Sequence, residues 1–352
     1  MLIADDAAPS RRTPATIRDV ALAAGVTVGT ASKALNGRGQ LRAETRERVR
    51  AAADRLEFRP NDLVRSLQRG RTFTVGLLTN DSFGRFTMPL LGGIEDALGA
   101  AEILVFLSNL RDDPEREATV ITSLLAKQVD GLIVMGRRSD PRPPLPVGRS
   151  RLPIVYANSR VTDPTALSLL PDDVQGGRLA TEHLLRAGRR HLAHVTGPAH
   201  WEAVQHRRDG MAAALAAHGL TLPEERVLCG AWTEAWGYAA VGRLLERDPA
   251  VDALFCGSDL IARGALDALR EQGRLVPDDV AVVGFDNWEI IAAAARPPLT
   301  TVDMNLHDLG QEAARRLLAA VAGEVAAGTI RLPCRLVVRA SCGGANLAGS
   351  DA

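Results

Sequence analysis

The side chains that could do covalent chemistry are sparse in this chain and have no catalytic spacing. Its 352 residues include 7 His and 4 Cys. The cysteines, none in a CxxC pair, are Cys229, Cys256, Cys334 and Cys342. This pattern favours neither a zinc site nor a disulfide framework, and it is typical of a reducing compartment. We interpret four histidines as solvent-facing or locally bonded: His191, His194, His206 and His218.

The sequence motifs of several enzyme classes are also missing. No GxGxxG follows the first predicted strand, and no GxxxxGK[ST] phosphate loop or GxSxG nucleophile turn occurs. We therefore expect neither catalysis nor a cofactor. Lys and Arg can still bind anions through their positive charge, and they are unevenly distributed along the chain. Residues 1–71 hold 14 Lys and Arg against 8 Asp and Glu, a net charge of +6, which leaves −6 for the rest of a chain whose totals are 42 and 42. A basic N-terminal segment favours contact with a polyanion.

The basic segment contains a pattern for two short helices around a tight turn, at residues 16–36. The apolar face of the first helix, at i, i+3, i+4 and i+7, consists of Ile17, Val20, Ala21 and Ala24. Thr16 and Thr27 can cap the two helices, and Gly25 can end the first in a left-handed conformation. The second helix has an inward face of Ala31, Ala34 and Leu35. This is the pattern of a helix-turn-helix, whose second helix enters the DNA major groove, with an ordinary αα-hairpin as the alternative.

Two further helices are expected after this motif. The segment 44–56 predicts a third helix whose buried face is Val49, Ala52, Ala53 and Leu56. Pro60 then stops it, and residues 62–68 predict one more short helix, ended by Gly70. Because isolated helices below about 12 residues are marginal in water, we expect this last helix to form only when something holds it.

These residues resemble the head of the lactose-repressor/galactose-repressor (LacI/GalR) family of bacterial transcription regulators. The resemblance rests on TIRDVALAAGVTVGTASKALNG, ETRERV and FRPNDLVRSL. It implies that base edges are faced by Val28, Gly29 and Lys33. It implies phosphate contacts from Thr16, Thr27, Thr30, Ser32, Asn36 and Thr45. Asn61 then lies at the hinge entry, and Leu67 is a wedge between base pairs in the minor groove.

Three positions depart from the family pattern. Gly29 has no side chain to read a base, and Lys33 replaces the usual Arg, so that a single ammonium stands where two guanidinium donors are common. Arg42 stands where a small capping residue is common. These departures leave DNA binding as the expectation but change the expected sequence preference.

From residue 73 onward the pattern changes to short apolar runs that alternate with helical stretches. The runs are TVGLLT, ILVFLSN, DGLIVMG, PIVYAN, HLAHVTG, ALFCGS and VAVVGFD. The helical stretches are 90–101, 116–127, 176–187, 207–218, 235–246, 260–272 and 309–321. This alternation predicts parallel sheets buried on both faces. The number of units favours two doubly wound halves, with a break near 163–172 and further crossings near 300 and 330. Ligands bind beyond the carboxyl ends of such strands, so two facing halves predict a cleft.

This body resembles the effector domain of the same family, which shares its fold with periplasmic sugar-binding proteins. The landmarks are DDVQGGRLATEHLLRAGRRHLAHVTGP, RRDGMAAAL, FCGSDLIARGALDAL, VPDDVAVVGFDN and PPLTTV. The resemblance implies that Arg207 clamps a hydroxyl or an anion, that Asp286 accepts hydrogen bonds from ligand hydroxyls, and that Trp232 stacks on a flat ligand face. Second-tier candidates are Asp81, Phe86, Ser258, Asp259 and Leu306. Ser258 departs from a common Asn, and Gly84-Arg85-Phe86 from a common Asn-Pro-Phe, so a simple sugar is not assumed.

The sequence thus predicts an all-α helix-turn-helix head followed by an α/β body with two doubly wound parallel-sheet subdomains of the periplasmic-binding-protein type I architecture. The expected segments are an N-terminal arm (1–15), the head (16–60), a hinge (61–72), the effector-binding body (73–340) and a polar tail (341–352). We expect a cytoplasmic homodimer that binds an operator in double-stranded DNA and a small-molecule effector such as a sugar. No apolar run reaches the roughly 18 residues of a membrane span, and no secretory signal or tetramer-forming heptad is visible. The alternatives are a transport binding protein and a carbohydrate-modifying enzyme, and the sign of the ligand response stays open.

Overall fold

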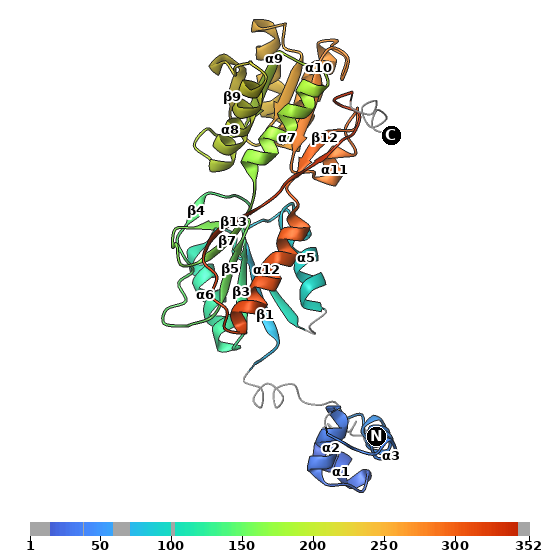
Figure 1. The fold of residues 1–352 in the computed structure, drawn as a ribbon. Coiled ribbons are helices and arrows are strands. Elements are labelled where there is room, and N and C mark those ends of the chain that lie inside the picture. The colour runs from blue at the N-terminus through green and yellow to red at the C-terminus, as the bar shows by residue number, and fades with distance from the viewer. Residues whose placement is uncertain (1–14, 38, 59–70, 100–102, 344–352) are drawn as a thin grey trace, which may run out of the picture. The chain divides into compact units, whose positions relative to one another are not determined.

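The protein forms two compact units, residues 1–72 and 73–352, in a computed structural model that describes residues 15–37, 39–58, 71–99 and 103–343. The expected hinge helix at 62–68, with Asn61 and Leu67, lies outside the described residues. In the described part of the chain, no helix is long and apolar enough to span a membrane. Figure 1 shows the elements in chain order.

The first unit is a bundle of three short helices. They are α1 (Ile17–Ala23), α2 (Val28–Leu35) and α3 (Ala43–Arg55). Their shared core consists of small side chains, all at most 5% exposed: Val20, Ala21, Ala24, Ala31, Ala34, Val49, Ala52 and Ala53. The predicted buried faces of all three helices are therefore confirmed. Small residues at the contacts let short helices approach closely enough to exclude water from so small a core.

The turn between α1 and α2 has the predicted local chemistry. Thr16 and Asp19 form a reciprocal capping box at the start of α1. Gly25 follows α1 with φ +63°, the left-handed conformation that glycine adopts without a steric cost. The Thr27 side chain accepts a hydrogen bond from the Thr30 N–H at the start of α2. By contrast, Arg42 at the N-cap of α3 makes no capping hydrogen bond.

The second unit is built on two six-stranded sheets (Figure 1). The first has the order β13-β7-β5-β3-β1-β2 and is parallel throughout. Its strands are β1 (Thr74–Thr79), β2 (Leu104–Asn109), β3 (Gly131–Met135), β5 (Ile154–Ala157), β7 (Leu167–Pro171) and β13 (Gly328–Leu332). The second has the order β14-β12-β11-β10-β8-β9, with only β14 antiparallel. Its strands are β8 (Leu192–Thr196), β9 (Val227–Cys229), β10 (Ala253–Cys256), β11 (Ala281–Phe285), β12 (Thr300–Asp303) and β14 (Arg335–Val337). Two short strands, β4 (Pro141–Arg142) and β6 (Arg160–Val161), pair separately.

Helices cover both faces of each sheet, as the predicted doubly wound architecture requires. On the first sheet, α5 (Thr87–Gly99) and α12 (Leu306–Val321) pack on the face with Leu77 and Ile133, and α6 (Pro114–Ala126) on the face with Leu78 and Leu132. The second sheet lies between α7 (Asp173–Arg186) with α8 (Glu202–Ala217) and α9 (Glu234–Arg247) with α10 (Asp259–Glu271). Two single turns, η1 (Glu224–Arg226) and α11 (Glu289–Ala292), precede β9 and follow β11.

The chain passes between the two sheets at three places. Strand β7 still belongs to the first sheet, and α7, which starts at Asp173, belongs to the second. The second passage lies between β12 and α12, and the third between β13 and β14. Three connections therefore join the two subdomains.

Three expectations about this unit need correction. The helices begin one to five residues earlier than predicted, since polar capping residues such as Asp113, Asp172 and Thr233 start them. Strand β2 is not buried on both faces, because it lies at an edge of the sheet. Of the two states expected for His194, solvent-facing is wrong and bonded is right: it is fully buried in β8, with its Nδ1 2.8 Å from the carbonyl oxygen of Phe255 on the neighbouring strand.

Candidate functional site

The first candidate site is the outward face of α2 in the first unit. The residues implied to face bases are exposed, with Val28 at 43% although it is apolar. Gly29 and Lys33 are exposed on the same helix, and Asn36 is exposed at its C-cap. Apolar exposure of this kind on a helix otherwise anchored by buried alanines leaves a surface free to enter a groove.

Polar side chains around this face are held by local hydrogen bonds. The hydroxyls of Thr27 and Thr30 lie 2.9 Å apart, and Asn36 Nδ2 donates to Ser32 Oγ at 3.3 Å. Thr16 donates to Asp19 through its N–H and its hydroxyl, and these bonds lower the pKa of the Asp19 carboxyl. Thr45 is half-buried on α3. Helix α3 is tied to the loop before it by Arg46, which donates to the Gly39 carbonyl, and to the end of α1 by Arg48, which donates to the Ala24 carbonyl.

The second candidate site is a cavity of about 560 Å³ in the second unit. Its walls come from both sheets: Asp81, Arg85, Phe86 and Asn158 follow strands of the first, and Trp232, Asp286 and Trp288 follow strands of the second. Every one of these residues lies beyond the carboxyl end of a strand, where open α/β sheets bind ligands. The predicted cleft between two halves therefore exists as a cavity.

Arg207 lines this cavity from α8 and is 4% exposed. Its Nε donates to Asp173 Oδ1 at 2.8 Å, and its Nη1 donates to the Gly257 carbonyl at 2.6 Å. The guanidinium lies 3.5 Å from the centre of the Phe285 ring and 5.9 Å from that of Trp232. Arg207 is thus a fixed part of the wall, with its charge already balanced by Asp173.

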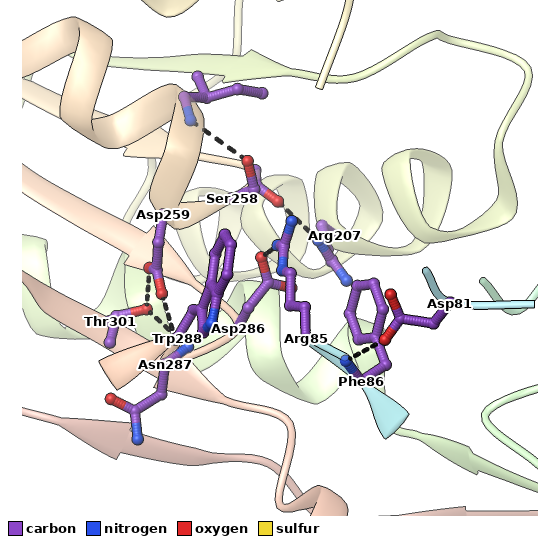
Figure 2. A network of polar contacts seen from close by, with 12 residues as sticks. Asp81, Arg85, Phe86, Arg207, Ser258, Asp259, Asp286, Asn287, Trp288 and Thr301 are labelled. Carbon is purple, nitrogen blue, oxygen red and sulfur yellow. Dashed lines mark hydrogen bonds and ion pairs between the residues drawn. The ribbon is translucent and has the colours of Figure 1, made fainter. Parts of the chain in front are cut away.

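Asp286 is held in an unusual backbone conformation directly after β11. Its φ of +108° is one that residues with a Cβ rarely adopt, and such strain is often retained at functional sites. Its carboxylate forms an ion pair with Arg85, which comes from the other subdomain (Figure 2). The side chains of Arg85 and Asp286 are 13% and 5% exposed. Arg85 entered the sequence reasoning only as a departure from the family pattern, and its pairing with Asp286 was missed.

Asp81 and Phe86 line the cavity at the start of α5. The Asp81 carboxylate accepts hydrogen bonds from the backbone N–H groups of Phe83, Phe86 and Thr87. It therefore fixes the loop that carries Arg85 and Phe86.

Three second-tier candidates lie behind the cavity wall instead of on it. Ser258 is fully buried and caps α10 by accepting from the Ile261 N–H at 3.3 Å. Asp259, also fully buried, accepts from Thr301 Oγ1 at 2.6 Å and from the Trp288 N–H at 2.7 Å, as Figure 2 shows. Leu306 is 5% exposed and packs in the core at the start of α12, while Met304 takes the place on the cavity wall. Asp259 positions Trp288 through the backbone and does not face the cavity.

Trp232 is half-buried on the cavity wall, and its ring packs where a Cβ on Gly197 would overlap it. Trp201 lies beside it, with ring centres 5.7 Å apart. With Trp288, these are three of the four tryptophans in the chain. The sequence reasoning named only Trp232. Trp201 and Trp288 follow the apolar runs HLAHVTG and VAVVGFD by a few residues, and this position after a strand was the signal available.

Comparisons with known proteins identify the relatives of both units. Residues 16–61 match the family described as Bacterial regulatory proteins, lacI family, and residues 181–342 match a Periplasmic binding protein-like domain. The HTH-type transcriptional regulator CelR of Thermobifida fusca is 36% identical over 337 residues, which cover 93% of this chain and 96% of CelR. The chain belongs to the LacI family.

Other LacI-family members match over nearly their whole length. Catabolite control protein A of Priestia megaterium is 32% identical over 93% of this chain and 98% of its own. A solved complex of the transcriptional regulator CelR with cellobiose has a TM-score of 0.66 at 33% identity, covering 93% of this chain and 99% of that one. A lac repressor dimer bound to operator and the anti-inducer ONPF has a TM-score of 0.76 at 27% identity, covering 94% and 99%. The predicted family and fold are confirmed, and the protein is a LacI-family transcriptional regulator.

Proposed function

We propose that this protein is a repressor that binds a pseudo-palindromic operator as a dimer and changes its DNA affinity when a sugar or related metabolite binds in the cavity of the second unit. The observation that carries the proposal is the combination of two sites in one chain. An anchored helix with an exposed face lies in one unit, and a cavity at the strand ends of two hinged subdomains lies in the other.

The DNA-binding role rests on α2 and on the charge of the N-terminal segment. Val28 and Lys33 are exposed on α2 and are the side chains proposed to reach base edges, with Gly29 allowing close backbone approach. Phosphates are proposed to be bound by Thr16, Thr27, Thr30, Ser32, Asn36 and Thr45. The net charge of +6 over residues 1–71 adds a sequence-independent attraction that weakens with salt.

The effector role rests on the aromatic and polar lining of the cavity. Three tryptophan rings offer flat faces for the apolar side of a sugar ring, and Asp286 offers carboxylate oxygens to its hydroxyls. Trp232 Nε1 is buried and has no hydrogen-bond partner among the described residues, so it is a donor that a ligand oxygen can use. The CelR–cellobiose complex makes cellobiose the first compound to test.

The coupling follows from the geometry of the second unit. A ligand that contacts both sheets favours one relative orientation of the subdomains, and this orientation governs whether two heads can reach two half-sites together. By linkage, DNA must change ligand affinity by the same factor, typically about 5–150-fold.

A second copy is proposed to cover the edge strand β2. Its Leu104, Phe106 and Leu107 are 68%, 40% and 47% exposed. An exposed apolar edge strand is a surface that proteins normally cover. The lac repressor structure that resembles this chain is a dimer. Since the proposed target is chromosomal DNA, we propose that the protein acts in the cytoplasm. We propose no catalytic role for the cavity.

The test combines DNA binding and ligand response in one preparation. Fluorescence anisotropy of the purified full chain with a palindromic site from near its own gene measures the operator Kd, with random DNA of the same length as control. Cellobiose and a panel of sugars, polyols and nucleosides are then screened by thermal shift. A ligand at 100 times its Kd stabilises the folded state by about 2.7 kcal/mol. Equal affinity for operator and random DNA would contradict the regulator role, and catalytic turnover of a bound sugar would favour the enzyme alternative.

A further inference from the structure

An ion pair between Arg85 and Asp286 joins the two sides of the cavity. Binding a neutral sugar does not require such a pair. Arg85 belongs to the loop between β1 and α5, and Asp286 follows β11. Both line the cavity, and their side chains are largely buried. Figure 2 shows the two side chains next to each other. The pair therefore lies between the two subdomains. One of its members, Asp286, is the residue that we expect to bind ligand hydroxyls.

Arg85 is held in this place by its surroundings. Its guanidinium lies 4.8 Å from the centre of the Phe86 ring and 5.5 Å from that of Trp288, which are cation–π distances. Its loop is fixed by the backbone hydrogen bonds that Asp81 accepts from Phe86 and Thr87. Burial lowers the pKa of Arg85 to about 10, so it remains a cation at neutral pH. The cavity therefore contains a positioned positive charge.

Ligand hydroxyls and Arg85 compete for the same carboxylate. Among the described residues, Asp286 is the only acidic side chain within 4 Å of the Arg85 guanidinium. Arg85 Nε is buried and has no hydrogen-bond partner in the described part of the chain. If a neutral ligand draws Asp286 away, the buried guanidinium loses its ion-pair partner and keeps only the longer-range attraction of Asp259 and Asp81, which is unfavourable. The nearby Arg207 cannot compensate, because it carries the same charge and is already paired with Asp173.

We propose that the effector carries an anionic group, a carboxylate or a phosphate, beside its hydroxyls, and that Arg85 is the residue that selects it. This inference rests on the proposed effector role of the cavity. The anion takes the place of Asp286 on Arg85, and Asp286 turns its oxygens to the ligand hydroxyls. A guanidinium suits both anions, since it presents paired N–H donors to planar or tetrahedral oxygens.

Matched neutral and acidic ligands test the proposal on the full-length protein. The pairs are cellobiose with cellobionate, glucose with glucuronate, and glucose with glucose 6-phosphate, and the last two separate a carboxylate from a phosphate. Isothermal titration in a buffer free of phosphate and carboxylates gives each Kd for the wild type, Arg85→Gln, Arg85→Lys and the control Arg178→Gln. Arg178 is exposed on α7 and pairs only with Glu182 among the described residues.

We expect the wild type to bind the acidic member of at least one pair about tenfold or more tightly than its neutral partner, as a charge-assisted bond supplies. Arg85→Gln abolishes this preference, Arg85→Lys retains part of it, and Arg178→Gln leaves it intact. Operator binding by each variant reports that it is folded.

Two results would overturn the inference. If the wild type binds neutral members as tightly as acidic ones and Arg85→Gln tightens neutral binding, Arg85 is a plug that the ligand displaces, and the proposed effector role stands. If neither class binds while operator binding is normal, the sugar-effector role fails together with the inference.

Discussion

At the scale of single residues, the cavity wall is built from charges that are already balanced inside the protein. Arg207 and Asp173 form a pair whose side chains are 5% and 1% exposed. Removing one partner of such a pair leaves the other charge buried and unpaired. Arg207 therefore stabilises the fold in addition to lining the ligand site. A residue whose only role is to bind ligand would not stabilise the fold.

We predict that Arg207→Ala lowers the free energy of unfolding by about 3–5 kcal/mol, because it leaves the Asp173 carboxylate uncompensated. The neighbouring Arg208→Ala is the control, since Arg208 pairs with Glu224 at the surface and such pairs contribute about 0–1 kcal/mol. Denaturant unfolding of both variants measures the difference. Equal, small losses would contradict a structural role for the buried pair.

Two buried groups in the second subdomain oppose each other in their pH dependence. Burial raises the pKa of Asp259 from 3.8 to about 6, although bonds from Thr301 and Trp288 act in the other direction. Between these values the folded state holds a proton that the unfolded state has lost, so stability falls as pH rises. Burial lowers the pKa of His194 from 6.5 to about 4. There the unfolded state binds the extra proton, so stability rises with pH.

We predict that replacing either group leaves the pH dependence of the free energy of unfolding controlled by the other. Asp259→Asn should make the free energy of unfolding rise more steeply between pH 4 and 6 than in the wild type, by about 2 kcal/mol over the window. His194→Gln should make it fall more steeply over the same window. Urea unfolding at a series of pH values measures both slopes. Parallel profiles for Asp259→Asn and the wild type would mean that Asp259 ionises with an ordinary pKa.

At the scale of elements, the head consists of helices whose ends are unequally capped. Helices α1 and α2 begin at threonines that accept backbone hydrogen bonds, whereas α3 begins at Arg42, whose side chain makes none. The first N–H groups of α3 therefore have no side-chain acceptor at this position.

We predict that Arg42→Ser stabilises α3 by about 1 kcal/mol, because a serine hydroxyl can accept from the N–H two or three residues on. Arg42→Ala removes the same charge without supplying an acceptor and is the matched control. Hydrogen exchange of the α3 amides in the full chain reports the change. If the two variants protect α3 equally, the effect comes from charge and not from capping.

At the scale of the whole molecule, the proposed dimer depends on strand β2. Its apolar side chains are exposed at the sheet edge, while β1, β3 and β7 of the same sheet bury theirs. Lys127 lies over the Phe106 ring at 5.8 Å and covers only part of this surface.

We predict that Leu104→Glu raises the dimer dissociation constant about tenfold or more, because it buries an unpaired charge at the interface. Val325→Glu is the control, since Val325 is 95% exposed in the loop before β13. Analytical ultracentrifugation measures the dissociation constant, and operator binding should weaken in parallel. A dimer that is unchanged by Leu104→Glu would exclude β2 from the interface.

The sequence by itself determined the parts of this protein that depend on local chemistry. Thr16, Gly25 and Thr27 define the turn of the head because capping and positive φ are properties of single residues. The alternation of apolar runs and helical stretches predicted the two doubly wound subdomains, because strands buried on both faces read as continuous apolar runs. Arg207, Asp286 and Trp232 were located through the resemblance to the LacI/GalR family.

Only the tertiary structure decided which of these side chains face the cavity and which form hydrogen bonds with other protein groups behind its wall. Ser258 and Asp259 follow a strand as the ligand residues do, but helix capping and the bonds to Thr301 and Trp288 turn them inward. The pairing of Arg85 with Asp286 joins residues 201 positions apart on separate sheets. No local pattern encodes such a contact, because it depends on how the subdomains close and on which charges find each other when water is removed.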